Sequence, residues 1–466
     1  MVRSDEYPQR GLFTALRSEF ASEVERLAAL AATCLDPAVG AEGLRSVELA
    51  IRTAVQALGG RLLEGLLEAD PGHRGNRVDC GKGHLATFVG YRGKTLDTVV
   101  GPVRLNRAYY HCGDCRGGVV PRDAELGVEG ASLSPGLERM VARVGAAQPF
   151  AKASGTLAEL AGVELTPKRV ERSSEANGGG LASAAEREAA AVLAGDLLPL
   201  GHGGPVEKLY VAMDGTGVPT VPADTEGRAG RSPDGRARTR EVKLGCLFTQ
   251  TGVDAEGRPV QDPGSSSYVG TFQAAEGFGS LLYAEACRRG LRQAREVVVL
   301  GDGAPWIWNL ADEHFPGAVQ VVDLYHARQH LHALGALVAP VLGEEHRAWV
   351  ASRLSDLDDG DVEALLAAAR DLQNPEGQAE EMEKALGYFE TNAERMRYAR
   401  FRGLGLFVGS GAVEAGCRAV VAQRLKLSGM RWTVRGASAI VALRCEEASG
   451  RWEEIWQQLH TQTSVA

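Results

Sequence analysis

Apolar residues at helical spacing open the chain. Between residues 11 and 70 they recur every three or four positions, as in Leu27, Leu30 and Cys34 and again in Val55, Leu58 and Leu62. This period is that of an amphipathic helix. We therefore predict an N-terminal helical region over residues 1–72.

The pattern of the next 130 residues changes twice. From Asn76 the runs HLATFVGYRG and KTLDTVVGPVRLNRAYYHC are rich in β-branched and aromatic residues and are joined by Gly-containing turns. They predict a small β unit over 73–130. Helical spacing returns from Pro135 to about Ser174, and the NGGG run with an Ala-rich stretch behind it is typical of a connector. We assign these helices and the connector to 131–200.

Strand-like and helix-like segments alternate over residues 201–326. The runs EKLYVAMDGTGVP, REVKLGCLFTQ and SSSYVGTFQ predict three strands, and FGSLLYAEACRRGL predicts a helix. The segments AREVVVLGDGAPWIWNL and AVQVVDLYHARQHL each predict a strand that leads into a helix. The order β-β-β-α-β-α-β predicts a mixed sheet covered by helices. All predicted elements after Tyr325 are helical, over 327–405 and 406–466, so the whole chain is expected to be a multidomain α/β protein.

Composition narrows the class of protein. The chain has 466 residues, of which 44% are hydrophobic and 24% charged, and no apolar run approaches the roughly 20 residues of a membrane span. The start MVRSDEYPQRG lacks the apolar segment of a signal peptide. We expect a cytoplasmic protein without a membrane partner. Its eight cysteines are then expected to be metal ligands or core residues rather than disulfides.

Charge is unevenly distributed along the chain. The formal net charge of -9 argues against a polyanionic partner, but the acidic excess is concentrated between Glu344 and Glu394. The segment from Arg74 to Arg107 is basic, and the segment from Ala415 to Cys445 contains no acidic residue. Each basic segment is either a phosphate-contacting surface or an ordinary solvated face.

Three carboxylates stand in positions suited to metal chemistry. Asp214 follows the apolar run LYVAM and Asp302 follows VVVLG, so each is expected at or just beyond the end of a buried strand, with Gly directly after it. Glu414 lies in GSGAVEAGCRAVVAQRL, a Gly-rich entry into a helix. Clustered carboxylates bind hard divalent cations, and two such ions support in-line phosphoryl displacement. The alternative is structural, because Asp-Gly is a common turn pair and an acid at a strand end often caps a helix.

A second candidate metal site lies in the β unit. Cys112 and Cys115 form a C-x-x-C pair after RAYYH, and Cys80 and His84 upstream would complete a set of four zinc ligands. His111 is an alternative nitrogen ligand. A third reading is that these cysteines are free thiols near a turn.

Two segments are candidates for DNA contact. In GTLAELAGVELTPKRVERSSEA we predict a helix-turn-helix with its turn at Gly162 and its second helix beginning after Thr166 and Pro167. Its early turns carry Lys168, Arg169 and Arg172, which would face a major groove, although any pair of short amphipathic helices fits the same pattern. In RLKLSGMRWTVRG the candidate contacts are basic residues and one aromatic residue: Arg424, Lys426, Arg431, Trp432 and Arg435. Trp432 would stack on an unpaired base, with core packing as the alternative.

The sequence resembles the DDE transposases of bacterial insertion sequences, most closely those of the Kra type. The residues that carry the likeness are VAMDGTGVP, the segment from VVVLGDGAPWIWNL to VVDLYHARQHL, and SGAVEAGCRAVVAQRLKLSGMRW. The resemblance implies a ribonuclease H-like core with a mixed β-sheet and an all-helical insertion. A helical region, a zinc-ribbon-like β unit and the helix-turn-helix would precede this core. Zinc ribbons of similar transposases carry a C-x-x-C in both halves, and the Cys80 and His84 pair departs from that pattern.

The resemblance also implies a function. Asp214, Asp302 and Glu414 would be the catalytic residues and would bind two Mg²⁺ or Mn²⁺ ions. Asp323 and His326 look like the auxiliary Asp-x-x-His element of related enzymes, with a helix-capping Asp and a core-facing His as the alternative. The expected reaction is cleavage at transposon ends followed by attack of the 3′-hydroxyl on target DNA. The partners would be terminal inverted repeats, target DNA and further copies of the chain. The competing hypotheses are a catalytically inactive DNA-binding protein and a ribonuclease H-like nuclease.

Overall fold

The computed structural model describes residues 7–34, 40–197, 206–230, 235–372 and 378–462. The chain divides into two compact units. The first comprises Met1–Ser174 with Glu453–Ala466, and the second comprises Glu175–Trp452. None of the helices formed by the described residues combines the length and the apolarity needed to cross a bilayer.

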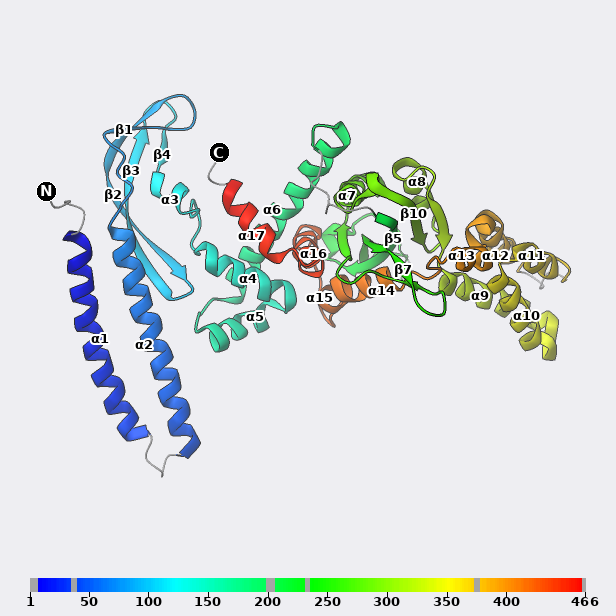
Figure 1. Cartoon of the computed structure of the whole chain (residues 1–466), viewed down its shortest axis with the longest axis horizontal. Coiled ribbons are helices and arrows are strands. Elements are labelled where there is room, and N and C mark those ends of the chain that lie inside the picture. The colour runs from blue at the N-terminus through cyan, green and yellow to red at the C-terminus, as the bar shows by residue number, and fades with distance from the viewer. Residues whose placement is uncertain (1–6, 35–39, 198–205, 231–234, 373–377, 463–466) are drawn as a thin grey trace. The chain divides into compact units, whose positions relative to one another are not determined.

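The first unit is built from helices around a small antiparallel sheet. Its helices are α1 (Tyr7–Cys34), α2 (Gly40–Glu68), α3 (Pro121–Glu125), α4 (Pro135–Ala147), α5 (Phe150–Thr156) with a π-helical turn at Leu157–Ala161, the start of α6 (Pro167–Ala194), and α17 (Trp452–Gln462). Its strands are β1 (Arg77–Asp79), β2 (Leu85–Thr98), β3 (Gly101–Cys112) and β4 (Gly117–Val119). Helices α1 and α2 lie side by side as a long hairpin, and the strands follow one another as a meander (Figure 1). Helices and β unit therefore occur where the spacing of apolar residues predicts them.

The predicted helix-turn-helix segment has the expected outline. Helix α5 and its π-helical turn end at Gly162, which has a φ of 67°, and α6 begins at Pro167. The hydroxyl of Thr166 accepts a hydrogen bond from the backbone N–H of Arg169 at 3.3 Å, as a helix-capping residue does. Leu157, Val163 and Val170 are buried in a shared core. Two helices joined by a turn are thus confirmed, while the second helix is much longer than predicted.

The glycine run is a point of difference. Asn177 to Gly180 is part of the uninterrupted helix α6, whereas the sequence predicts a connector that begins there. The reason is packing, because a Cβ added to Gly178 would lie 2.1 Å from the backbone oxygen of Ala439 in α16. Glycine is needed where these two helices approach each other closely.

The second unit contains a five-stranded mixed sheet covered by helices. Its strands are β5 (Val206–Pro219), β6 (Thr239–Gln250), β9 (Ser267–Thr271), β10 (Ala294–Gly301) and β11 (Val319–Val322), with a small separate hairpin of β7 (Gly252–Val253) and β8 (Pro259–Val260). Its helices after α6 are α7 (Ala275–Arg288), α8 (Pro305–His314), α9 (Leu324–Leu342), α10 (His346–Asp359), α11 (Val362–Arg370), α12 (Ala379–Asn392), α13 (Tyr398–Gly403), α14 (Gly411–Gly416) with a π-helical turn at Cys417–Ala422, α15 (Gln423–Leu425) and α16 (Val434–Ala448). The mixed α/β class and the predicted order β-β-β-α-β-α-β are confirmed.

The strand order places β5 at the centre of the sheet. Across the sheet the order is β11-β10-β5-β6-β9. Strands β10 and β11 run parallel to β5, whereas β6 runs antiparallel to both β5 and β9. The carboxyl ends of β5, β10 and β11 therefore share one edge of the sheet, which is where α/β sheets place their sites.

The helical segment from α9 to α13 shares the hydrophobic core of the sheet. Val299 of β10, Leu334 of α9 and Phe389 of α12 are each fully buried in one continuous cluster. Figure 1 shows these helices gathered on one side of the second unit. The segment is therefore packed as part of this unit, and its helices can contact the strand ends.

Candidate functional site

Asp214 and Asp302 lie toward the shared edge of the sheet, in different local settings. Asp302 directly follows β10, as predicted, and its Oδ1 accepts a hydrogen bond from the N–H of Ala304 at 2.9 Å. Asp214 does not end its strand. It pairs with Leu244 of β6, and β5 continues to Pro219. The prediction of a strand end at Asp214 is wrong because the glycines behind it remain extended opposite β6.

The parallel pairing of β5 nevertheless stops before Asp214. The last residues paired between β5 and β10 are Ala212 and Leu300. Asp214 therefore lies just past the parallel part of the sheet, on the same side as Asp302. Both residues are half-buried.

Asp323, His326 and Glu414 form a compact group at the same edge. One ligand atom from each residue lies within 4.8 Å of the others. Asp323 is fully buried and begins α9, where its Oδ1 accepts from the backbone N–H of His326 at 2.8 Å and lies 3.2 Å from the Nδ1 of that residue. Its Oδ2 accepts from the backbone N–H of Ser410. Asp323 is thus a helix cap, and it also connects α9 to the segment that leads to Glu414.

The protonation of this group follows from its contacts. Burial alone would raise the pKa of Asp323, but hydrogen bonds from His326 and Ser410 lower it below its ordinary value. The hydrogen bond to Asp323 raises the pKa of His326, against the effect of burial, and the nearby charges of Asp302 and Glu414 add to the rise. His326 is therefore within electrostatic reach of two predicted catalytic carboxylates.

Glu414 lies on α14, and Cys417 lies on the π-helical turn that continues it. Glu414 is exposed, and its Oε1 accepts from the hydroxyl of Ser410 at 3.2 Å. One turn later, the thiol of Cys417 donates to the Oδ2 of Asp214 at 3.2 Å. Burial and the Asp214 carboxylate raise the pKa of Cys417, so the thiol keeps its proton. Glu414 thus lies three positions before the residue that contacts Asp214.

The arrangement offers mainly carboxylate oxygens to a ligand. Asp214 and Asp302 lie outside the 4.8 Å group of potential ligands among the described residues, while Asp323, His326 and Glu414 make up that group. Oxygen donors of this kind suit Mg²⁺ and Mn²⁺, which commonly keep water or take substrate phosphate oxygens as their remaining ligands. The edge of the sheet therefore has the chemistry for a metal-assisted reaction on a phosphate group.

The predicted DNA-contacting residues of the C-terminal segment separate into two classes. Lys426, Arg431 and Arg435 are exposed, and the Nζ of Lys426 donates to Thr216, two residues after Asp214. Arg424 is 0% exposed and lies 4.8 Å from the ring centroid of Trp432, which is itself buried. The prediction that Arg424 contacts DNA is therefore wrong for this structure. Trp432 follows the core-packing alternative, because its Nε1 donates to the backbone oxygen of Leu425 at 3.2 Å.

Arginine residues also line a groove beside β5. A cavity of about 1170 Å³ is bordered by Arg228, Arg236 and Arg238 of the loop between β5 and β6 and by Arg431. A neighbouring cavity shares Arg238 and extends to Gly215. The two cavities together extend from Gly215 to Arg431, and their lining contains these four arginines together with Glu226 and Glu241.

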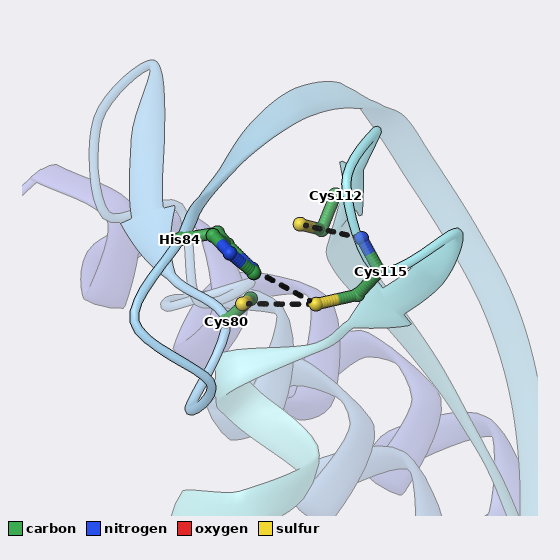
Figure 2. A group of neighbouring side chains, drawn as sticks. All are labelled: Cys80, His84, Cys112 and Cys115. Atoms are coloured by element: carbon green, nitrogen blue, oxygen red, sulfur yellow. Dashed lines mark hydrogen bonds between the residues drawn. The ribbon is translucent and has the colours of Figure 1, made fainter.

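Cys80, His84, Cys112 and Cys115 converge in the β unit, as predicted. Their ligand atoms lie within 4.8 Å of one another, and the side chains point toward a common centre from two loops (Figure 2). The Sγ of Cys115 lies 3.7 Å from the Sγ of Cys80 and 3.2 Å from the Nδ1 of His84. His111 is exposed and lies outside the group, so the structure favours His84 over this alternative.

The pKa values of two thiols in this group are shifted in opposite directions. Burial would raise the pKa of Cys80, but backbone N–H groups of Lys82 and His84 and the neighbouring thiols lower it to about 7. Burial and the adjacent Cys80 and Cys112 raise the pKa of Cys115 to about 11. Close thiols that compete for charge in this way are the donors that a divalent cation binds well, because the cation stabilises every thiolate at once.

The predicted contacts of the helix-turn-helix are partly engaged within the first unit. Arg169 forms an ion pair with Asp97 at 2.7 Å, and Lys168 pairs with Glu171 at 2.8 Å. Arg172 is exposed. The basic stretch from Arg74 to Arg107 is also partly used in folding, because Arg74 and Arg107 both pair with carboxylates.

Comparison with known proteins yields one match. Residues 288–457 fit the sequence model of UPF0236, an uncharacterised protein family. This segment contains Asp302, Asp323, His326 and Glu414 but not Asp214. No curated protein matches the chain. The matched segment contains β10, β11 and the helices that follow them, and the description of the family names no activity.

Sequence reasoning missed Ser410, Cys417 and Tyr388. Each contacts a predicted site residue: Ser410 contacts Asp323 and Glu414, Cys417 contacts Asp214, and Tyr388 donates to the backbone oxygen of Asp302 at 3.0 Å. Ser410 and Cys417 lie within four residues of Glu414 in the sequence, and this closeness could have identified them as neighbours of the site. Tyr388 lies in α12 of the helical segment, and nothing in its local pattern indicates a contact with β10.

Proposed function

We propose that the protein is a DNA transposase that cleaves transposon ends and joins the freed 3′-hydroxyl to target DNA. The observation that carries this proposal is the gathering of Asp214, Asp302, Asp323, His326 and Glu414 at one edge of the second unit's sheet. They come from four places in the chain: β5, the turn after β10, the start of α9, and α14. The resemblance to DDE transposases gives Asp214, Asp302 and Glu414 their roles as the catalytic carboxylates.

The topology of the sheet supports a ribonuclease H-like core. Across the sheet the strands lie in the order β9, β6, β5, β10 and β11, with the first strand in the chain, β5, at the centre. Strand β6 is antiparallel to β5 and β9, and the other four strands share one direction. This is the arrangement expected of that core. The all-helical segment between β11 and α14 stands where the resemblance expects an insertion.

The residues at the sheet edge fit a pair of divalent cations. Asp214, Asp302 and Glu414 supply oxygen donors that are reachable from solvent, which matches the ligand preference of Mg²⁺ and Mn²⁺. When bound, two such ions activate a water or a 3′-hydroxyl and stabilise the leaving oxygen of a phosphodiester. Asp323 holds His326 beside Glu414, so the imidazole can orient a phosphate or a water at this edge.

Basic residues outside the carboxylate cluster support DNA as the substrate. Lys426 lies next to Thr216 and so places a positive charge near Asp214. The arginine-lined groove beside β5 adds further positive charge, which favours binding of a phosphate backbone. Arg172 and the helix-turn-helix of the first unit are a second DNA-contacting surface in this proposal.

A structural zinc ion in the β unit completes the proposal. Three thiols and one imidazole whose ligand atoms converge within 4.8 Å match the Cys₃His donor set of structural zinc sites. With the ion bound, Cys80 and His84 would fasten the loop between β1 and β2 to Cys112 and Cys115. The β unit would then be zinc-ribbon-like and would present the neighbouring basic segment in a fixed conformation.

The test is cleavage and strand joining with DNA that carries both ends of the element encoding the chain. We compare the wild type, with Mg²⁺, to Asp214→Asn, Asp302→Asn and Glu414→Gln. Asp312→Asn is the matched control, because Asp312 is an exposed carboxylate on α8 of the same unit. We expect each of the three site variants to lose at least 100-fold in rate, since each removes an oxygen ligand, and to keep DNA binding.

Other outcomes would assign the chain differently. Cleavage without strand joining would make the protein a nuclease of the same core. Binding to the ends without cleavage by the wild type would make it a DNA-binding protein. Full activity in any of the three site variants would remove that residue from the catalytic set.

A further inference from the structure

Two tyrosines of the helical segment donate hydrogen bonds to the ends of neighbouring strands. The hydroxyl of Tyr388 in α12 donates to the backbone oxygen of Asp302 at 3.0 Å. The hydroxyl of Tyr398 in α13 donates to the backbone oxygen of Val322, also at 3.0 Å. Val322 ends β11 and immediately precedes Asp323. The segment therefore contacts the backbone at two of the positions where the sheet presents its carboxylates.

The turn after β10 is shaped to fit Tyr388. Gly303 has a φ of +99°, and a Cβ on this residue would lie 2.7 Å from the ring of Tyr388. The ring also stacks on His330 of α9, with 3.6 Å between the ring centroids and 14° between the ring planes. Tyr388 is thus held by these neighbours while its hydroxyl reaches Asp302. Glycine is required in this turn both by its backbone conformation and by the closeness of the ring.

Tyr398 contacts the end of β11 as Tyr388 contacts the residue after β10. Its side chain is fully buried. Burial raises its pKa well above the ordinary value, so the hydroxyl keeps its proton and acts as a donor. The two strand ends are also joined to each other, because the N–H of Asp323 donates to the oxygen of Gly301 at 2.7 Å. A shift of either end would therefore disturb the other.

We propose that Tyr388 and Tyr398 are positioning residues through which the helical segment fixes the backbone at Asp302 and Asp323. Neither hydroxyl contacts a reacting atom, so they act through the carboxylates that they place. This inference rests on the proposed function for its chemical meaning, because it treats Asp302 as a metal ligand. Residues that orient metal ligands typically change metal affinity by roughly 10- to 100-fold when replaced.

The test replaces each tyrosine with phenylalanine, which removes the hydroxyl and leaves the ring. Tyr210→Phe is the matched control, because Tyr210 is a fully buried tyrosine of β5 whose hydroxyl donates to Gln250 at 2.5 Å and accepts from the backbone N–H of Phe407 at 3.3 Å, and neither partner is a site carboxylate. Hydrogen exchange of backbone amides reports local anchoring without any metal. Calorimetric titration with Mn²⁺ alone then reports binding at the site.

We expect Tyr388→Phe to increase exchange at residues 302–304 and Tyr398→Phe to increase it at residues 323–326. We expect Tyr388→Phe to weaken Mn²⁺ binding by about tenfold or more. Tyr210→Phe should change neither the exchange at these turns nor the Mn²⁺ affinity. Unchanged exchange at both turns, or an equal effect of the control, overturns the inference. If exchange changes as expected but the wild type binds no Mn²⁺ at this site, the anchoring stands and the two-metal function fails.

Discussion

Glu285 shows how this protein accommodates a buried charge. The carboxylate is 3% exposed in α7, and Arg451 and Arg288 contact it at 2.7 Å and 2.9 Å. Burial alone would raise the pKa of Glu285, but the guanidinium groups outweigh it and hold the pKa below its ordinary value. The charge is therefore kept by its partners rather than by water.

Replacing Glu285 should destabilise the second unit strongly. Glu285→Gln removes the buried carboxylate that the guanidinium groups of Arg288, Arg289 and Arg451 share, and breaking such a buried pair costs about 3 kcal/mol or more of unfolding free energy. Glu276→Gln is the control, since Glu276 is exposed in the first turn of the same helix and should cost less than about 1 kcal/mol. Urea unfolding of both variants measures the difference, and equal losses would show that the buried network is not stabilising.

The same carboxylate predicts a dependence on pH. Because the folded-state pKa is lowered, the stability that Glu285 contributes is present above the unfolded-state pKa of about 4.3 and is lost as pH falls through the lower, folded value. The gap in unfolding free energy between the wild type and Glu285→Gln should therefore be largest near neutral pH and narrow in acid. A gap that stayed constant from pH 7 to pH 3 would contradict this assignment.

At the scale of elements, two neighbouring glycines of α6 allow the effect of helix propensity to be compared with the effect of packing. Gly178 lies against the backbone of Ala439, while Gly179, next to it in the same helix, has open space where a Cβ would be added. We expect Gly179→Ala to stabilise the protein by about 0.5 to 1 kcal/mol, because alanine is the better helix former. Gly178→Ala should instead destabilise it, because the new methyl group forces α6 and α16 apart. Thermal unfolding of the two variants distinguishes these outcomes, and stabilisation by both would mean that the helices do not pack closely.

The sequence predicted most elements of the second unit because their apolar residues are contiguous and their turns are marked. Asp302 was placed correctly since its strand ends where VVVLG ends. Asp214 was placed at the strand end because the apolar run LYVAM stops there, but β5 continues to Pro219, as the predicted strand EKLYVAMDGTGVP does. Pairing partners are distant in sequence, so the local pattern carries no information about them.

Candidate site residues were predictable to the extent that they follow a local rule. Cys80, His84, Cys112 and Cys115 were found from metal-ligand spacing, and the structure brings them together. Arg424 has the same local surroundings as the exposed Lys426, yet its guanidinium is buried against Trp432. Tyr388 likewise gains its role only through tertiary contact, which no local rule describes.

At the scale of the whole molecule, we expect zinc to affect the first unit and not the second, because the four proposed ligands all lie in the first unit. We expect about one zinc ion per chain, lost in Cys112→Ser and kept in His111→Ala, since His111 lies outside the group of ligands. Removing the ion with a chelator should increase hydrogen exchange over residues 77–119 and leave the sheet over residues 206–322 unchanged, because these belong to different compact units. Elemental analysis and exchange measurements test both statements, and zinc retained by Cys112→Ser would refute the ligand assignment.

The division of the chain has a consequence for the order in which it is made. Residues 453–462 belong to the first unit, and they follow every residue of the second unit, which ends at Trp452, so a ribosome makes them after the second unit. At roughly 5 to 20 residues per second, the 200 residues that separate Asp214 from Glu414 take about 10 to 40 s to synthesise. All residues of the sheet and its carboxylates are therefore made before helix α17 of the first unit is complete. Deleting the residues that follow Trp452 would therefore remove part of the first unit and leave every residue of the second unit in place.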